Sequence, residues 1–224
     1  MPNKVFWTTL GADVIFLATG CLELGFCLIV RNLMFKQPKD GQEAVRNLIY
    51  QTFPIDAGIV NAAFIIFVAV FTAAGLLSPV RLVLKASGYA IALCGLFTLC
   101  IGVALWVETL TIRDTFFPTY VAQEPQVQEL IQTTFNCCGY INFTTPAFVT
   151  DPTCPSPAAA ALLRGCSVFI SSFANTFIDN IFTAVFGMVG MDALLILAIS
   201  CLLKDRKERE RYRHIDDKSG FRQF

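Results

Sequence analysis

Residues 87–107 read SGYAIALCGLFTLCIGVALWV, a run without a single charged side chain. At a rise of about 1.5 Å per residue, a helix of this length crosses the hydrocarbon core of a bilayer, which is about 30 Å thick. Three further apolar runs of similar length lie at 10–30, 57–77 and 181–203. The sequence therefore predicts an all-α membrane protein with four transmembrane helices over these ranges.

The overall composition agrees with a membrane protein. Of the 224 residues, 55% are hydrophobic and only 15% are charged, and 17 Lys and Arg balance 17 Asp and Glu. A soluble domain carries about 25% charged residues, so this chain could not build an ordinary polar surface. Disordered chains do not tolerate so many apolar residues, and nucleic-acid binding is disfavoured because no net positive charge offsets phosphates.

The distribution of Lys and Arg predicts the orientation of the helices. Eight of these residues follow position 203, and the short connection 78–86 holds Arg81 and Lys85. The long connection 108–180 holds only Arg113 and Arg164. Because Lys and Arg are enriched in cytosolic segments, we expect both termini to lie in the cytosol. The expected location is the plasma membrane or the membrane of endomembrane vesicles. The expected order is a cytosolic N-terminus 1–9, a small extracellular loop 31–56, a cytosolic loop 78–86, a large extracellular loop 108–180 and a cytosolic tail 204–224.

Four of the nine cysteines lie in the expected large loop, at positions 137, 138, 154 and 166. An even number of cysteines in an exoplasmic segment predicts disulfides. A bond between the neighbours Cys137 and Cys138 would be far from the preferred Cα separation, so two pairings stay open. A zinc site is disfavoured, because the only histidine is His214 in the tail.

Prolines and helical periodicity divide the first half of this loop. We expect the third helix to continue through 108–117 and to stop at Pro118, which has no backbone N–H. Pro125 suits the first turn of a new helix, which should end at Cys137-Cys138-Gly139, with Gly139 free to turn left-handed. The expected apolar face of that helix consists of Val127, Leu130, Ile131 and Phe135.

The second half of the loop contains four further prolines between 140 and 157, which predict turns instead of a long helix. From Ala158, an alanine-rich stretch could restart a helix that Gly165 interrupts. Residues 166–180 should lead helically into the fourth span. We expect partner specificity to lie in the irregular stretch 140–164.

These features together resemble the tetraspanin family over the whole chain. The resemblance rests on four spans, a short first and a long second outer loop, and three motifs: Cys137-Cys138-Gly139, Pro152-Thr153-Cys154 and Gly165-Cys166. Claudin-like four-span proteins instead carry their cystine in the first loop, which has no cysteine here. The resemblance implies the nested pairing Cys137–Cys166 and Cys138–Cys154.

The resemblance also implies a function. Tetraspanins organise membranes by binding other integral membrane proteins laterally, through the large loop and the faces of the spans. The chain departs from the family pattern in the third span, where Thr98 and Leu99 stand in place of a carboxylate, and in the second connection, which lacks the usual cysteines. These departures and the short length resemble most the small tetraspanin of filamentous, plant-pathogenic fungi. That branch implies polarised growth and host penetration through appressoria, alongside a membrane NADPH oxidase complex.

Three acids lie inside the predicted spans: Asp13, Glu23 and Asp192. Asp13 and Asp192 stand where the family has polar residues in the first and fourth spans. By resemblance Asp192 shares a hydrogen bond with Asp13, and a bound sterol or other lipid is a second candidate partner. The alternative function is a small transporter or proton-linked channel, because intramembrane acids mark ion paths.

No enzyme is expected. The outer loop offers no convincing nucleophile with a base, and Gly-rich phosphate loops and metal-binding histidine clusters are absent from the sequence. We therefore expect a non-enzymatic membrane organiser without a cofactor or metal, and without a nucleic-acid partner.

Small residues recur every seven positions along three of the predicted spans. Close backbone approach through such residues holds helices together in lipid, so we expect packing seams there. The seam residues are Gly11, Ala18 and Gly25 in the first span, Ala62 and Ala69 in the second, and Gly88, Gly95 and Gly102 in the third.

Two covalent modifications are predicted. Asn142-Phe143-Thr144 is an N-glycosylation acceptor in the expected outer loop. Cys201, three residues before Lys204, is the candidate for palmitoylation at the inner membrane face. The deeper cysteines, Cys21, Cys27, Cys94 and Cys100, are interpreted as packing residues.

Overall fold

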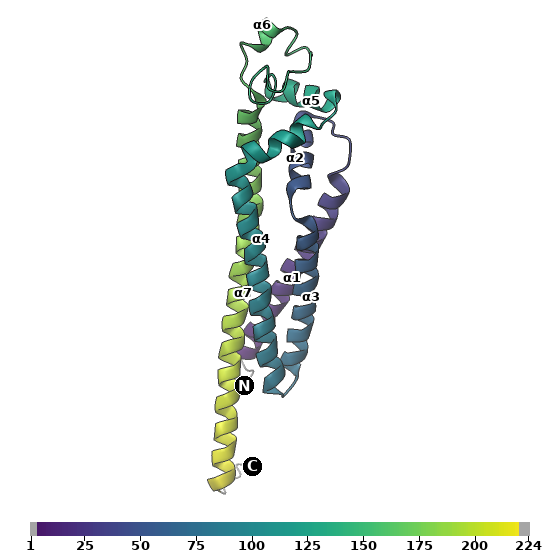
Figure 1. Cartoon of the computed structure of the whole chain (residues 1–224). Helices are drawn as coiled ribbons and strands as arrows, with labels where there is room; N and C mark the ends of the chain where they lie inside the picture. Colours follow the sequence, from purple (N-terminus) through teal and green to yellow (C-terminus); the bar gives the residue numbers. More distant parts are fainter. Residues whose placement is uncertain (1–3, 220–224) are drawn as a thin grey trace. The chain divides into compact units, whose positions relative to one another are not determined.

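A computed structural model describes residues 4–219, apart from the side chains of residues 214 and 216–219. Within this range the chain forms seven helices and no strand, only two isolated β-bridges (Figure 1). The helices are α1 (Lys4–Leu33), α2 (Gly41–Thr52), α3 (Ile55–Leu77), α4 (Arg81–Val121), α5 (Pro125–Phe135), α6 (Pro157–Ala160) and α7 (Cys166–Ser219). The predicted all-α fold is confirmed. His214 and Lys218 lie outside the described side chains, as do Arg222 and the ends 1–3 and 220–224 of the two expected cytosolic termini.

Four of these helices, α1, α3, α4 and α7, are long and apolar enough to cross a membrane. They contain the four predicted runs, which indicates an integral membrane protein. Two of them extend far beyond the apolar run: α4 has 41 residues and α7 has 54. The continuous helix from Cys166 onward confirms the expected helical lead into the fourth run.

The expectation that Pro118 ends the helix is wrong. Pro118 lies inside α4, which continues to Val121. A proline lacks the N–H that would bond to the preceding turn, but its own carbonyl still accepts, here from the Ala122 N–H at 3.1 Å. Phe116 and Tyr120 are fully buried on either side of the proline, so tertiary packing holds the last turn in place.

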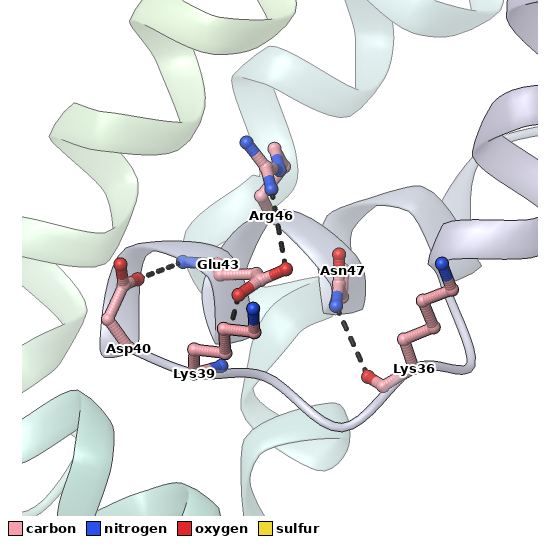
Figure 2. Close-up of polar contacts among 6 residues, drawn as sticks. All are labelled: Lys36, Lys39, Asp40, Glu43, Arg46 and Asn47. Atoms are coloured by element: carbon pink, nitrogen blue, oxygen red, sulfur yellow. Dashed lines mark hydrogen bonds and ion pairs between the residues drawn. The ribbon is translucent and has the colours of Figure 1, made fainter.

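The connection expected as the small loop contains a helix, α2, that the sequence reading did not anticipate. Asp40 caps it, because its Oδ1 accepts from the Glu43 N–H at 2.7 Å, and Glu43 Oε2 accepts from the Lys39 N–H at 3.0 Å (Figure 2). The Asn47 amide also donates to the Lys36 carbonyl at 3.4 Å. An Asp followed three residues later by Glu is the capping signal that could have found this helix.

The chain divides into two compact units. The first consists of the described residues of Met1–Gly25, Ala57–Cys100 and Val185–Phe224. Its core combines buried side chains from all four long helices: Phe16, Ile65, Val68, Ala69, Leu76, Leu84, Ile91, Cys94, Leu195, Ile199 and Leu202.

The second unit consists of Phe26–Asp56 and Ile101–Ala184. In it α2 packs against α5 so closely that a Cβ added at Gly41 would overlap the Leu130 carbonyl. The Gly41 N–H donates to Thr134 Oγ1 at 3.0 Å, and the Tyr50 ring of α2 meets Phe177 of α7 at 5.5 Å between centroids. This unit contains the cysteines of the predicted large loop.

The small-residue seams hold for α3 and α4 but not for α1. Ala62, Ala69 and Gly102 are buried, and a Cβ at Gly95 or Gly88 would contact Asp192 or Ile199 of α7. In α1, Gly11 and Ala18 are exposed, and a Cβ at Gly25 would meet nothing within 4 Å in the described part of the chain.

The first helix packs through another face with the same period. Thr9, Asp13, Phe16 and Gly20 are buried there, at alternating spacings of four and three residues. A Cβ at Gly20 would lie 2.5 Å from Ile65 Cγ2, so α1 and α3 are in close contact at this glycine. A seven-residue period in the sequence predicts that residues seven apart lie on one face of the helix. It does not predict which face packs against the neighbouring helix.

This revised seam predicts different costs for two glycine substitutions in α1. Gly20→Val should destabilise the bundle by about 1–3 kcal/mol, because the added methyl groups must enter a filled contact. Gly11→Val removes the same backbone freedom at an exposed position and should be nearly neutral. Thermal unfolding of the purified full chain in detergent measures both, and equal melting temperatures for the two variants would contradict the seam.

Candidate functional site

The candidate site is the segment 136–166, called here the cystine segment. Its two disulfides join Cys137 to Cys166 and Cys138 to Cys154, with Cα separations of 5.0 and 6.0 Å. All four cysteines are completely buried. This is the nested pairing that the family resemblance implies, and it is one of the two that the residues alone left open.

The backbone of the Cys-Cys-Gly corner is fixed by its environment. The helix α5 ends at Phe135, with Pro125 at its first turn as predicted, but Asn136 at φ 50° is the left-handed cap, not Gly139. Asparagine tolerates this conformation better than most residues. Gly139 is also left-handed, at φ 70°, and a Cβ there would overlap the Asn142 carbonyl oxygen, so only glycine fits.

Three backbone hydrogen bonds tie this corner to the start of α7. The Cys138 N–H donates to the Arg164 carbonyl at 3.2 Å. The N–H groups of Cys166 and Ser167 donate to the carbonyls of Gly139 and Tyr140 at 3.0 and 2.9 Å. The cystine segment therefore begins and ends at one clamped junction.

Gln132 of α5 forms the polar centre of this arrangement. Its Nε2 donates to the Val149 carbonyl at 2.8 Å and to Asp151 Oδ2 at 2.7 Å. Its Oε1 accepts from the N–H groups of Gly139 and Val149 at 3.3 and 3.2 Å. Gln132 is fully buried, and Asp151 in turn accepts from the Cys154 N–H at 2.5 Å.

The sequence reading missed both Gln132 and Asp151. Asp151 precedes a proline, and Asp-Pro favours a turn, so a local signal existed for it. Gln132 offered none, because its partners lie 7, 17 and 19 residues away.

Tyr140 connects the corner to α4. Its hydroxyl donates to the Arg113 carbonyl at 2.7 Å, and its ring lies 5.1 Å from that of Tyr120. Burial raises the pKa of Tyr140 to about 12, and burial also raises the pKa of Tyr120 well above its usual range. Both phenols therefore stay neutral far above physiological pH, and Tyr140 remains a hydrogen-bond donor.

The outer part of the cystine segment exposes apolar side chains. Ser156 caps the single turn α6, which starts at Pro157 and ends at Ala160, well before the expected break at Gly165. Beyond it Leu162 is 87% exposed, and Ile141 is 49% exposed. A Cβ added at Gly165 would overlap the Ile141 carbonyl oxygen, so the exposed Ile141 lies directly against the clamped junction.

The predicted glycosylation acceptor is accessible. Asn142 is exposed, and its Oδ1 accepts from the Thr144 N–H at 2.9 Å and from the Thr144 hydroxyl at 2.7 Å. The acceptor triplet therefore forms a compact Asx turn on the surface.

The acids of the predicted spans lie in the first unit, and the structure gives them unequal partners. The Asn61 amide of α3 donates to both carboxylate oxygens of Glu23 and to Thr98 Oγ1, each at 3.1 Å. Asn61 and Thr98 are buried, so this group joins α1, α3 and α4. Thr98 is one of the two residues, with Leu99, at which the resemblance leads one to expect a carboxylate.

The expected hydrogen bond between Asp192 and Asp13 is not formed. Both residues are buried, but Oδ1 of Asp13 and Oδ2 of Asp192 have no hydrogen-bond partner among the described residues. Asp192 instead packs against Gly95 of α4, where the missing side chain leaves room for its carboxyl group. Asn61, which the sequence analysis did not single out, is the amide that binds an acid of the predicted spans.

The cysteines outside the disulfides fall into two groups. Cys27 and Cys94 are buried, in agreement with a packing role. Cys21 and Cys100 are exposed, so their interpretation as packing residues is wrong. Cys201, the palmitoylation candidate, is also exposed.

Comparisons with known proteins give no relative: no family model matches the chain, and no curated protein or solved structure shows significant similarity.

The central position of Gln132 yields a prediction. Gln132→Ala should cost about 2 kcal/mol, because the buried N–H of Gly139 and the part-buried N–H of Val149 lose their acceptor. Hydrogen exchange of these two amides in the full chain should accelerate accordingly. Gln126→Ala, at an exposed position of the same helix, is the matched control. Unchanged protection of both amides in Gln132→Ala would refute the role of this side chain.

Proposed function

We propose that this protein is a tetraspanin-like membrane organiser that binds other integral membrane proteins laterally. The observation that carries the proposal is the cystine segment: two nested disulfides and the buried Gln132 amide hold an excursion that exposes Ile141 and Leu162. A rigid segment loses less conformational entropy when it binds a partner, so preorganisation of this kind favours a binding surface.

In this proposal the segments 31–56 and 108–180 lie outside the cell or in a vesicle lumen, and both termini lie in the cytosol. The excess of Lys and Arg after residue 203 supports this orientation. The disulfides support it as well, because they persist in oxidising compartments. By resemblance, the partners include a membrane NADPH oxidase complex of a fungal cell.

The second candidate is a small transporter or proton-linked channel, favoured by the buried Asp192, whose Oδ2 lacks a hydrogen-bond partner within the described part of the chain. The bonding of Glu23 argues for a structural role instead, since the Asn61 amide binds both of its oxygens. Ion or proton flux through the purified chain in liposomes separates the two functions: flux that Asp192→Asn abolishes would favour transport.

The organiser proposal predicts that partner binding depends on the inner disulfide. Cys138→Ser removes a bridge that closes a separation of 16 residues and contributes roughly 3 kcal/mol in the chain-entropy model. Crosslinking in native membranes, followed by quantitative mass spectrometry, should find the captured membrane proteins reduced to background.

Two variants serve as controls for this experiment. Cys100→Ser makes the same chemical change at an exposed free cysteine and should capture partners normally. The double variant Cys138→Ser/Cys154→Ser excludes mispairing of the released thiol. All variants should resist alkaline extraction from membranes, since the apolar helices are unchanged. Normal capture by the double variant would overturn the proposal.

The orientation yields its own prediction. When the chain is expressed in eukaryotic cells, an endoglycosidase should increase its mobility, and Asn142→Gln should abolish that shift. Protease added to sealed, right-side-out vesicles should cleave within 108–180 and leave the tail intact. A fully protected large segment together with a digested tail would invert the topology.

A further inference from the structure

The first unit contains a pocket of about 310 Å³ that none of the functions above uses. It lies where α3 ends, between the turn 77–79 and the polar extension of α7. Three arginines of α7 line it, Arg206, Arg209 and Arg213, together with a single acid, Glu210. We propose that this pocket binds the phosphate-bearing headgroup of an anionic membrane lipid.

The walls of the pocket are fixed by hydrogen bonds. Arg206 donates from Nη1 to the Ser78 carbonyl at 2.8 Å and from Nη2 to the Leu76 carbonyl at 2.6 Å. Arg206 thereby satisfies carbonyls that the end of α3 leaves open. On the other side, Arg81 donates to the Arg206 carbonyl at 3.0 Å and forms an ion pair with Glu210.

The other two arginines keep donors for a ligand. Arg209 uses its Nε for an ion pair with Asp205 at 3.0 Å, which leaves its two terminal nitrogens. Arg213 has no hydrogen-bond or ion-pair partner among the described residues. Among the described side chains, four arginines, counting Arg81, face the two acids Glu210 and Asp205. These groups carry a net charge of about +2 (four minus two), which suits a phosphate.

The surroundings favour a lipid over a soluble phosphate. Leu77 lines the pocket and is 81% exposed, and Val80 and Leu82 beside it are 50% and 73% exposed. The apolar part of α3 ends at Leu77, so the pocket stands at the boundary between an apolar span and a polar extension. A ligand with an anionic head and acyl chains matches both surfaces, and basic pockets at this level of a membrane protein bind such headgroups.

The arginines of α7 fall on one face because they follow the helical period. Residues 206, 209 and 213 are three and four positions apart, so their side chains are neighbours. Arg211 has the same charge in the same helix, but it is turned about 140–160° away from them and does not line the pocket. It therefore provides a matched control for net charge.

The test uses the purified full chain in neutral detergent, with dioctanoyl phosphatidylinositol 4-phosphate as the probe and dioctanoyl phosphatidylcholine as the reference. Native mass spectrometry or microscale thermophoresis should detect saturable binding of the anionic lipid. Arg209→Gln and Arg213→Gln should each weaken it about fivefold, the factor that corresponds to about 1 kcal/mol per basic residue. Arg211→Gln should bind as the wild type does.

Three outcomes would overturn the proposal. Equal weakening by Arg211→Gln and Arg213→Gln would indicate a diffuse charge effect instead of a pocket. The free headgroup of the probe is inositol 1,4-bisphosphate. If this headgroup or inorganic phosphate bound as tightly as the lipid, the ligand would be a soluble anion. If phosphatidylcholine bound as tightly as phosphatidylinositol 4-phosphate, the arginines would not determine which lipid binds. Because the readout is lipid affinity, the result is independent of partner capture by the cystine segment.

Discussion

The constraint on which the structure depends is that a backbone surrounded by apolar side chains must satisfy its own hydrogen bonds. In hydrocarbon no water replaces a missing partner, so an apolar run of about 20 residues becomes a helix. Four such runs determine four long helices, and the other elements occupy the connections between them. Where helices approach closely, as at Gly20 beside Ile65, one of the two facing residues must be small.

The cystine segment is stabilised in a different way, because it forms little regular helix and buries few apolar side chains of its own. It is rich in proline, and the apolar cluster formed by Cys138, Cys154 and Ala160 with three partly buried neighbours is small. So small a core supplies little stabilisation, and covalent bridges compensate by restricting the unfolded chain. The buried Gln132 amide adds what the bridges cannot supply, since it binds the buried N–H of Gly139 and the part-buried N–H and carbonyl of Val149.

This difference explains which parts could be predicted from the sequence. The four helices follow from composition and length alone, and the start of α5 follows from Pro125, because these signals are local. The capping pair Asp40 and Glu43 is equally local, so the start of α2 could also have been predicted from the sequence. Gln132 and Asn61 could not be found this way, because each joins segments far apart in the sequence. The phase of the α1 seam also depends on the neighbouring helix.

Arg206 has two roles, and a count of charged residues reveals only one of them. In the sequence it is one of eight basic residues after position 203, all of which point to a cytosolic tail. In the structure its guanidinium is bonded to the carbonyls of Leu76 and Ser78, so it closes the end of α3 and fixes α7 against the turn that follows. That bonding leaves its charge in place while removing its mobility. The positive charge near this end of the first unit is therefore held in a defined geometry, which a solvated basic tail would not provide. A fixed arrangement of guanidinium groups selects a ligand by shape as well as by charge, whereas mobile charges select only by valence.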